Sequence, residues 1–188
     1  MTLIETEPPL TEPVTLADVK AHLKIEHSDE DGLVTALIAA ARRHLEAVTG
    51  LALVSQGFRL ILDDWPDAGV ISLRRYPVQS VEAVLVYDAD GVPLTLDPAT
   101  ILLDGRARPA RLLLRERIAP QQALNGIEID FTAGFPSSAE VPADLVRALL
   151  MHVAMMYELR GAISPDQQPA AIPRGYDRLV APYQRRSL

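Results

Sequence analysis

Two long stretches of the chain carry apolar residues at intervals of three and four, a spacing that predicts one buried face on each of two α-helices. The first predicted helix is Asp29–Thr49, with Ser28 or Asp29 as its N-cap and Gly50 as its C-terminal stop. The acidic residues at its start suit the positive end of the helix dipole. Its predicted apolar stripe consists of Leu33, Leu37, Ala40, Ala41, His44, Leu45 and Val48.

The second long stretch predicts a helix from Ala143 to about Arg160, opened by Pro142 and ended by Gly161. Proline is favoured where a helix begins, because its missing N–H has no partner in the first turn. Residues 162–188 are then expected to form a loop and a short helical or extended C-terminal tail.

A shorter helix is predicted at Leu16–Leu23. Thr15 is a favoured N-cap type, and Asp18, three residues later, favours the exposed N–H groups of the first turn. Residues 1–13, rich in proline and glutamate, are expected to form an extended arm in front of this helix.

Between residues 51 and 135 the pattern changes to short β-rich runs separated by proline and glycine, which predicts antiparallel strands. The run VEAVLVYDADGVPLTLD predicts a hairpin that turns at Asp90-Gly91. Further strands are predicted in LVSQGFRLILDDW, VISLRRYPV, RLLLRER and GIEIDFTAG. The predicted class is therefore α+β: a helical bundle with an inserted antiparallel β region, in a single domain spanning residues 1–188.

Composition narrows the class of protein. The chain has 188 residues, 48% of them hydrophobic, and a net charge of −7, which argues against a protein that binds nucleic acid through a basic face. It has no cysteine, so disulfides and thiolate metal sites are excluded. We recognise neither a signal peptide nor an apolar run long enough for a membrane span, so a soluble cytoplasmic product is expected.

The charge is uneven. Residues 1–31 contain eight acidic residues and two lysines, whereas residues 174–188 contain four arginines and one aspartate. Either the two ends meet different partners, or a solvated acidic arm and a frayed basic tail flank the domain.

The segment AHLKIEHSDEDG raises the question of a metal site, because it contains His22, His27 and four acidic residues. It lacks the HExxH pattern, and no third histidine lies nearby. Helix capping explains the same residue types, so we expect this segment to join two helices. No bound metal and no cofactor is expected.

No catalytic motif accompanies this segment. YDADGV lacks the first and last ligands of a calcium loop, no serine lies in a nucleophile elbow, and no phosphate-binding glycine pattern is present. His44 and His152 fall on or beside apolar helix faces, where core or interface histidines are common. The enzyme class therefore has no support in the residues.

Five segments, in order, are informative together: PVTLADVKAHLKIEHSDEDGLVTALIAAARRHLEAVTG, VLVYDADGVPLTLD, IEIDFTAGF, VPADLVRALLMHVAMMYELRGA and RLVAPYQ. From Pro13 to Gln184 they resemble the head–tail connector (adaptor) family of long-tailed phages and phage-derived gene transfer agents. Met155-Met156 departs from the family pattern, in which a tryptophan precedes the position of Tyr157.

The resemblance implies a structural, non-catalytic protein that forms a dodecameric ring at the head–tail junction of a particle assembled in the bacterial cytoplasm. The implied partners are further copies of the chain, the portal protein above and a stopper or tail-completion protein below. DNA would pass through the central channel without specific binding, and no membrane is involved. The alternatives are a stopper or tail-completion protein, and a small bacterial ligand-binding or metal-dependent enzyme domain.

Two surfaces follow as hypotheses. The ring interface is expected on the two long helices, whose apolar residues exceed one stripe, at Val34, Ile38, Leu150 and Met155. The resemblance implies that the C-terminal segment docks onto the portal; the residues assigned to this contact are Ile172, Arg174, Tyr176, Arg178, Leu179, Val180, Tyr183, Arg185 and Arg186. The alternative is a tail that folds back onto its own helices, with Leu179 and Val180 in the core.

Overall fold

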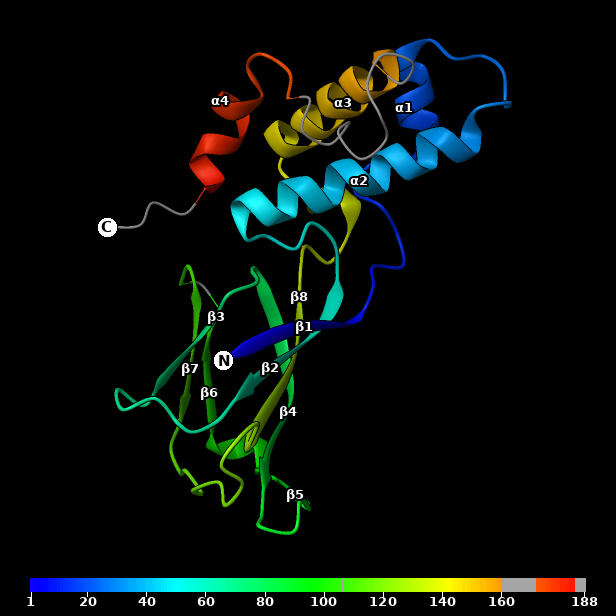
Figure 1. The fold of residues 1–188 in the computed structure, drawn as a ribbon. Helices are drawn as coiled ribbons and strands as arrows, with labels where there is room; N and C mark the ends of the chain where they lie inside the picture. Colours follow the sequence, from blue (N-terminus) through cyan, green and yellow to red (C-terminus); the bar gives the residue numbers. More distant parts are fainter. Residues whose placement is uncertain (106, 160–171, 185–188) are drawn as a thin grey trace. The chain divides into compact units, whose positions relative to one another are not determined.

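The computed structural model describes residues 1–105, 107–159 and 172–184, and the chain forms two compact units (Figure 1). The β unit consists of Met1–Leu10 and Ser55–Pro136. The helical unit consists of Thr11–Val54 and the described residues from Ser137 onward. The predicted α+β class is confirmed, and Ser55–Pro136 of the β unit lie between helices in the sequence, as expected.

The larger sheet of the β unit has five antiparallel strands in the order β1-β2-β8-β4-β5 (Figure 1). Along β2 and β8 every second side chain is buried, so one side of these strands contributes to the core and the other faces outward. The strands are β1 (Thr2–Glu7), β2 (Gln56–Leu62), β4 (Val78–Tyr87), β5 (Pro93–Thr95) and β8 (Ile127–Ala133).

The smaller sheet has three antiparallel strands in the order β3-β7-β6. They are β3 (Val70–Leu73), β6 (Ile101–Asp104) and β7 (Ala110–Leu114), and a short 3-10 helix, Pro98–Thr100, precedes β6. Alternation again divides β3 and β7 into buried and exposed side chains. The buried ones add to the core of the β unit.

The predicted hairpin is confirmed as β4 and β5. Its loop is held by Asp88, whose carboxylate accepts hydrogen bonds from the backbone N–H groups of Asp90 (3.0 Å) and Val92 (2.8 Å). Gly91 has φ +78°, a conformation that favours glycine. The aspartates of this segment therefore form a turn, as the sequence indicated.

Two strands were not predicted, β1 and β6. The first residues were expected as part of an extended arm, but Thr2–Glu7 pairs along β2. Gly57 permits this approach, because a Cβ there would lie 2.9 Å from the Thr6 hydroxyl oxygen. β1 is nearly all exposed, so its sequence lacks the alternation that identifies a strand.

In the helical unit, α3 contacts α1, α2 and α4. The helices are α1 (Leu16–Leu23), α2 (Asp31–Thr49), α3 (Ala143–Glu158) and α4 (Tyr176–Val180), with 3-10 turns at Ser138–Glu140 and Ala181–Tyr183. Within the part of the chain that the structure describes, no helix is long and apolar enough to cross a membrane. Gly161, the predicted end of the last helix, lies outside the described residues.

The helix caps confirm one prediction and correct another. The Asp18 N–H donates to the Thr15 hydroxyl (3.1 Å), and the Thr15 N–H donates to the Asp18 carboxylate (3.0 Å), a complete capping box. The prediction that Ser28 or Asp29 caps α2 is wrong: the N-cap is Glu30, which makes no side-chain cap. Gly50 ends α2 as predicted, with φ +75°.

Candidate assembly surfaces

The acidic segment between α1 and α2 makes contacts within the helical unit. The Asp31 carboxylate accepts a hydrogen bond from the Lys20 ammonium at 2.6 Å, and the Glu30 carboxylate accepts one from the Tyr157 hydroxyl on α3. The His27 ring lies 4.0 Å from Glu30. Among the described residues no group of three or more histidine and acidic side chains could hold a metal ion. The segment therefore fastens α1 and α3 to the start of α2.

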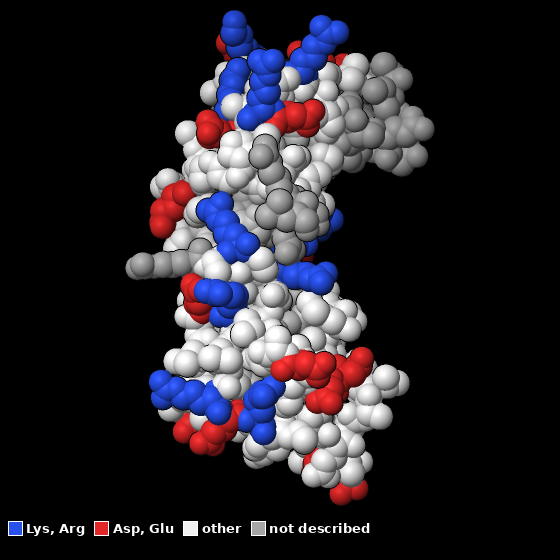
Figure 2. Space-filling view, turned by 90° about the vertical axis from the view of Figure 1, so that its left-hand side faces the viewer, with Lys and Arg blue, Asp and Glu red and all other residues white. Residues whose placement is uncertain are grey.

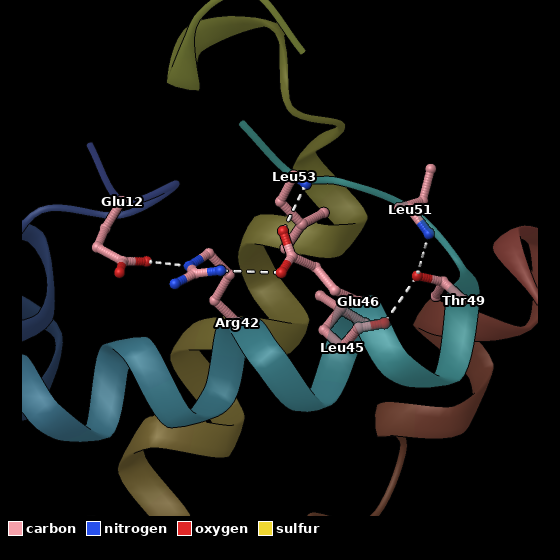
Figure 3. A network of polar contacts seen from close by, with 7 residues as sticks. All are labelled: Glu12, Arg42, Leu45, Glu46, Thr49, Leu51 and Leu53. Atoms are coloured by element: carbon pink, nitrogen blue, oxygen red, sulfur yellow. Dashed lines mark hydrogen bonds and ion pairs between the residues drawn. The ribbon is translucent and has the colours of Figure 1, made fainter. Parts of the chain in front are cut away.

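A buried ionic network lies on α2 (Figure 3). The Arg42 guanidinium donates to Glu12 at 2.8 Å and to Glu46, one helical turn along, at 2.9 Å. Burial by itself lowers the pKa of the Arg42 guanidinium, but the two carboxylates outweigh burial, so the pKa is raised. This network joins the segment that enters the helical unit to the middle of α2.

The same network holds the segment that follows α2. The second oxygen of Glu46 accepts from the Leu53 N–H at 2.9 Å (Figure 3). The Thr49 hydroxyl accepts from the Leu51 N–H at 3.2 Å and donates to the Leu45 carbonyl at 2.7 Å. Sequence reasoning missed these residues. The sequence did contain a signal for this ion pair: Arg42 and Glu46 are four residues apart, beside the apolar stripe.

A cluster of aromatic rings packs α4 against the other helices. The ring centroids of His44 on α2 and His152 on α3 are 5.0 Å apart, and Tyr176 on α4 lies 5.9 Å and 5.5 Å from them. His152 and Tyr176 are buried, and the Tyr176 hydroxyl has no hydrogen-bond partner among the described residues. Burial lowers the pKa of His44 and raises that of Tyr176. These contacts place both histidines at helix–helix packing positions.

Burial divides the described portal-binding residues into two groups. Tyr176 and Val180 are buried in the helical unit. They are therefore core residues and not the docking anchors that the sequence suggested. The structure leaves Ile172, Leu179 and Tyr183 half-buried and Arg174 and Arg178 exposed. Arg185 and Arg186 lie outside the described residues.

The predicted ring-interface residues divide in the same way. Val34 and Ile38 are 0% and 2% exposed, so their side chains are part of the core and are withdrawn as contacts to a neighbour. The burial of Val34 and Ile38 could not be predicted from hydrophobic spacing, because α2 is covered on more than one side. Leu150 and Met155 on α3 are half-buried and remain candidates.

Leu150 also lines a groove of about 790 Å³ beside α1 and the start of α3. The buried residues Val14 and Val141 and the half-buried Val146 give the groove an apolar lining. Arg147 and Asp18 add one positive and one negative charge to the lining. The groove has the character of a protein-docking surface, because it combines an apolar lining with few polar groups.

Comparison with known proteins is consistent with a protein that acts through contact surfaces. The model of the phage gp6-like head–tail connector protein family matches residues 13–91, which include α1, α2, β2, β3 and β4. In this segment the chain is similar to the phage gp6-like head–tail connector family. It is a structural protein of the head–tail junction and not an enzyme. No curated protein matches the chain.

Solved structures extend the similarity to the whole chain. One is a chain of the neck of an empty gene transfer agent particle, computed with C6 symmetry, with a TM-score of 0.82. Others come from the virion of a native gene transfer agent particle (TM-score 0.80) and from the neck of a native particle computed with C12 symmetry (0.75). Each is 29% identical to this chain, and each match covers 100% of this chain and 97% of the other.

Proposed function

We propose that this protein is the adaptor in the neck of a gene transfer agent or a related phage. Copies form a ring between the portal and the stopper or tail-completion protein. The observation that carries the proposal is the match along the entire chain to a chain from a gene transfer agent neck.

A dodecameric ring is part of the proposal. It is supported by the C12 symmetry of one neck that contains a similar chain. A closed ring needs a heterologous interface, in which two different surfaces of each copy meet. The half-buried Leu150 and Met155 on α3 are the candidates for one of these surfaces.

The proposed central channel lets DNA pass without specific binding. The net charge of −7 supports this, because proteins that hold DNA neutralise phosphates with basic side chains. Figure 2 shows one face of the protein, on which Lys and Arg side chains lie beside Asp and Glu side chains. Such a mixed surface attracts phosphates less than a continuous basic stripe does.

The portal contact is assigned to the outer side of the C-terminal segment. Arg174 and Arg178 are exposed, with Leu179 and Tyr183 half-buried beside them. Arginine and tyrosine are frequent binding hot spots, and exposed arginines suit an acidic receptor. Tyr176 and Val180 contribute indirectly, because they hold α4 on the helical unit.

The test is assembly with the portal of the same particle, measured by native mass spectrometry. A portal complex carrying a dodecamer of this chain is the expected result. A chain that does not bind the portal alone but binds the preassembled portal–adaptor complex is the stopper instead. A chain that binds neither is no neck component, and the proposal fails.

The tail contact is tested with Arg174→Glu/Arg178→Glu, using Asp177→Asn as a control at an exposed position of α4. The arginine variant should fold normally and capture less portal, most clearly at low salt, where exposed charges act over longer distances. Point variants are preferable to deletion of residues 172–188, since deletion also removes the buried Tyr176 and Val180. Unchanged capture by the arginine variant would refute the assignment.

A further inference from the structure

Leu10 is a fully exposed apolar residue in a proline-rich segment. Its side chain is 100% exposed, and it follows Glu7, Pro8 and Pro9. Proline fixes the backbone in an extended form, so such a segment loses little entropy when it binds. An exposed leucine on a preordered, acidic segment has the properties of an anchor for another protein surface.

The groove beside α1 and the start of α3 is a complementary surface. Its apolar lining includes Val14, Val141 and Leu150, and its volume of about 790 Å³ exceeds the volume of one leucine side chain. Two charged side chains, Asp18 and Arg147, line the groove. The Asp18 carboxylate accepts hydrogen bonds from Thr15 in the capping box, whereas Arg147 has no ion-pair partner among the described residues. A segment that combines a leucine with a carboxylate therefore suits the apolar lining and the charge of Arg147.

We propose that Leu10 of one copy occupies this groove in a neighbouring copy, with Glu7 facing Arg147 of that neighbour. The proposal rests on the ring proposed above and names two different surfaces for its heterologous contact. A second copy is the favoured occupant because each copy supplies one acidic leucine segment and one groove, so a closed ring fills every groove. The side chain of Leu10 is entirely exposed, so it is available to another copy.

Disulfide trapping tests the contact directly, because the chain has no cysteine of its own. Leu10→Cys and Ala143→Cys place one thiol on the segment and one on the groove, and Ala143 is an exposed groove residue. The double variant, oxidised after assembly, should give a ladder of covalent oligomers. A mixture of the two single variants should give covalent dimers only. The control Val92→Cys/Ala143→Cys moves the first thiol to another exposed apolar position and should give no ladder.

The energetic test uses Leu10→Asp, with Val92→Asp as the matched exposed control. Losing one buried leucine should weaken ring association about 10- to 100-fold, whereas the control should assemble normally. A charge reversal adds a second readout: Glu7→Arg and Arg147→Glu should each weaken the ring, and the two together should restore it.

Each other outcome rejects the contact for a separate reason. A disulfide formed within one monomer places the segment on its own groove. Normal rings without the covalent ladder show that Leu10 does not reach this groove. Normal rings with reduced portal capture by Leu10→Asp assign the segment to the portal. If the unmodified chain forms no ring, alone or on the portal, the proposed function fails together with this contact.

Discussion

The two units hold similar ion pairs in different surroundings. In the helical unit, Arg42 lies 2.9 Å from Glu46, and its side chain is 6% exposed. In the β unit, Arg59 lies 2.6 Å from Asp130 on the outward side of β2 and β8, and its side chain is 32% exposed. The distances are similar, but only the first pair is cut off from water.

Burial, rather than distance, decides what each pair contributes to stability. Water solvates Arg59 when Asp130 is lost, and Glu128 at 2.9 Å offers a second partner. Arg42 has little access to water, so it depends on its two carboxylates. The helical unit is therefore expected to be sensitive to loss of a charge, and the β unit tolerant.

The largest effect is expected for Glu46→Ala. It removes one of the two carboxylates that hold Arg42 and leaves the buried Leu53 N–H without its acceptor. We expect a loss of about 3–5 kcal/mol in the free energy of unfolding, the range for breaking a buried ion pair by removing one member. Urea denaturation monitored by circular dichroism measures it.

Arg42→Met/Glu46→Met serves as the comparison, because it removes both charges while filling the space. It should lose less stability than Glu46→Ala, although it leaves Glu12 without its arginine. A double variant as unstable as the single one would show that the network stabilises through hydrogen bonds to the backbone, and not by compensating Arg42.

The second effect concerns the attachment of α4. Tyr176→Ala should lower the free energy of unfolding by about 3 kcal/mol, because it empties a buried site against His44 and His152. Tyr176→Phe keeps the ring and removes only the hydroxyl, so it should be nearly neutral. A large loss in the phenylalanine variant would reveal a hydrogen bond to that hydroxyl.

The third effect is small and completes the comparison of the two ion pairs. Asp130→Ala should cost less than about 1 kcal/mol, because the pair is partly solvated. Denaturation at low and high salt is the measurement, and the small difference from the unmodified protein should shrink as salt rises. A loss equal to that of Glu46→Ala would contradict the assignment of the difference to burial.

The smallest effect is a pH dependence at His44. Burial lowers the pKa of His44 in the folded protein, so the unfolded chain binds the proton more readily. Stability contributed by the neutral ring is therefore present above the unfolded pKa of about 6.5 and is lost as pH falls below it. Denaturation midpoints between pH 8 and pH 5 should fall less steeply for His44→Asn, and equal slopes would assign the dependence to other groups.

The predictability of the fold follows the range of the interactions in sequence. The helix caps depend on residues close together in sequence, so they could be predicted from the sequence. Examples are the capping box of Thr15 and Asp18 and the C-cap Gly50 after α2. The hairpin of β4 and β5 is local for the same reason. β1 was missed because it pairs with β2, fifty or more residues away, through backbone groups that its exposed side chains do not reveal.

The candidate surfaces were less predictable, since exposure depends on what covers a residue. Val34 and Ile38 have the apolar character of interface residues, but the fold buries them. Tyr176 and Val180 likewise have the character of docking anchors, but they lie in the core. Leu10 was not predicted as a contact residue, because a single leucine among prolines gives no periodic pattern.

The sequence alone determined the α+β class, the helix spans within a few residues, the absence of disulfides and the resemblance to the connector family. These depend on local patterns and composition, which need no knowledge of distant contacts. The tertiary structure decided which apolar residues are core and which are surface, and why Arg42 can be buried. Those properties depend on partners distant in sequence, such as Glu12, that folding brings within 2.8 Å.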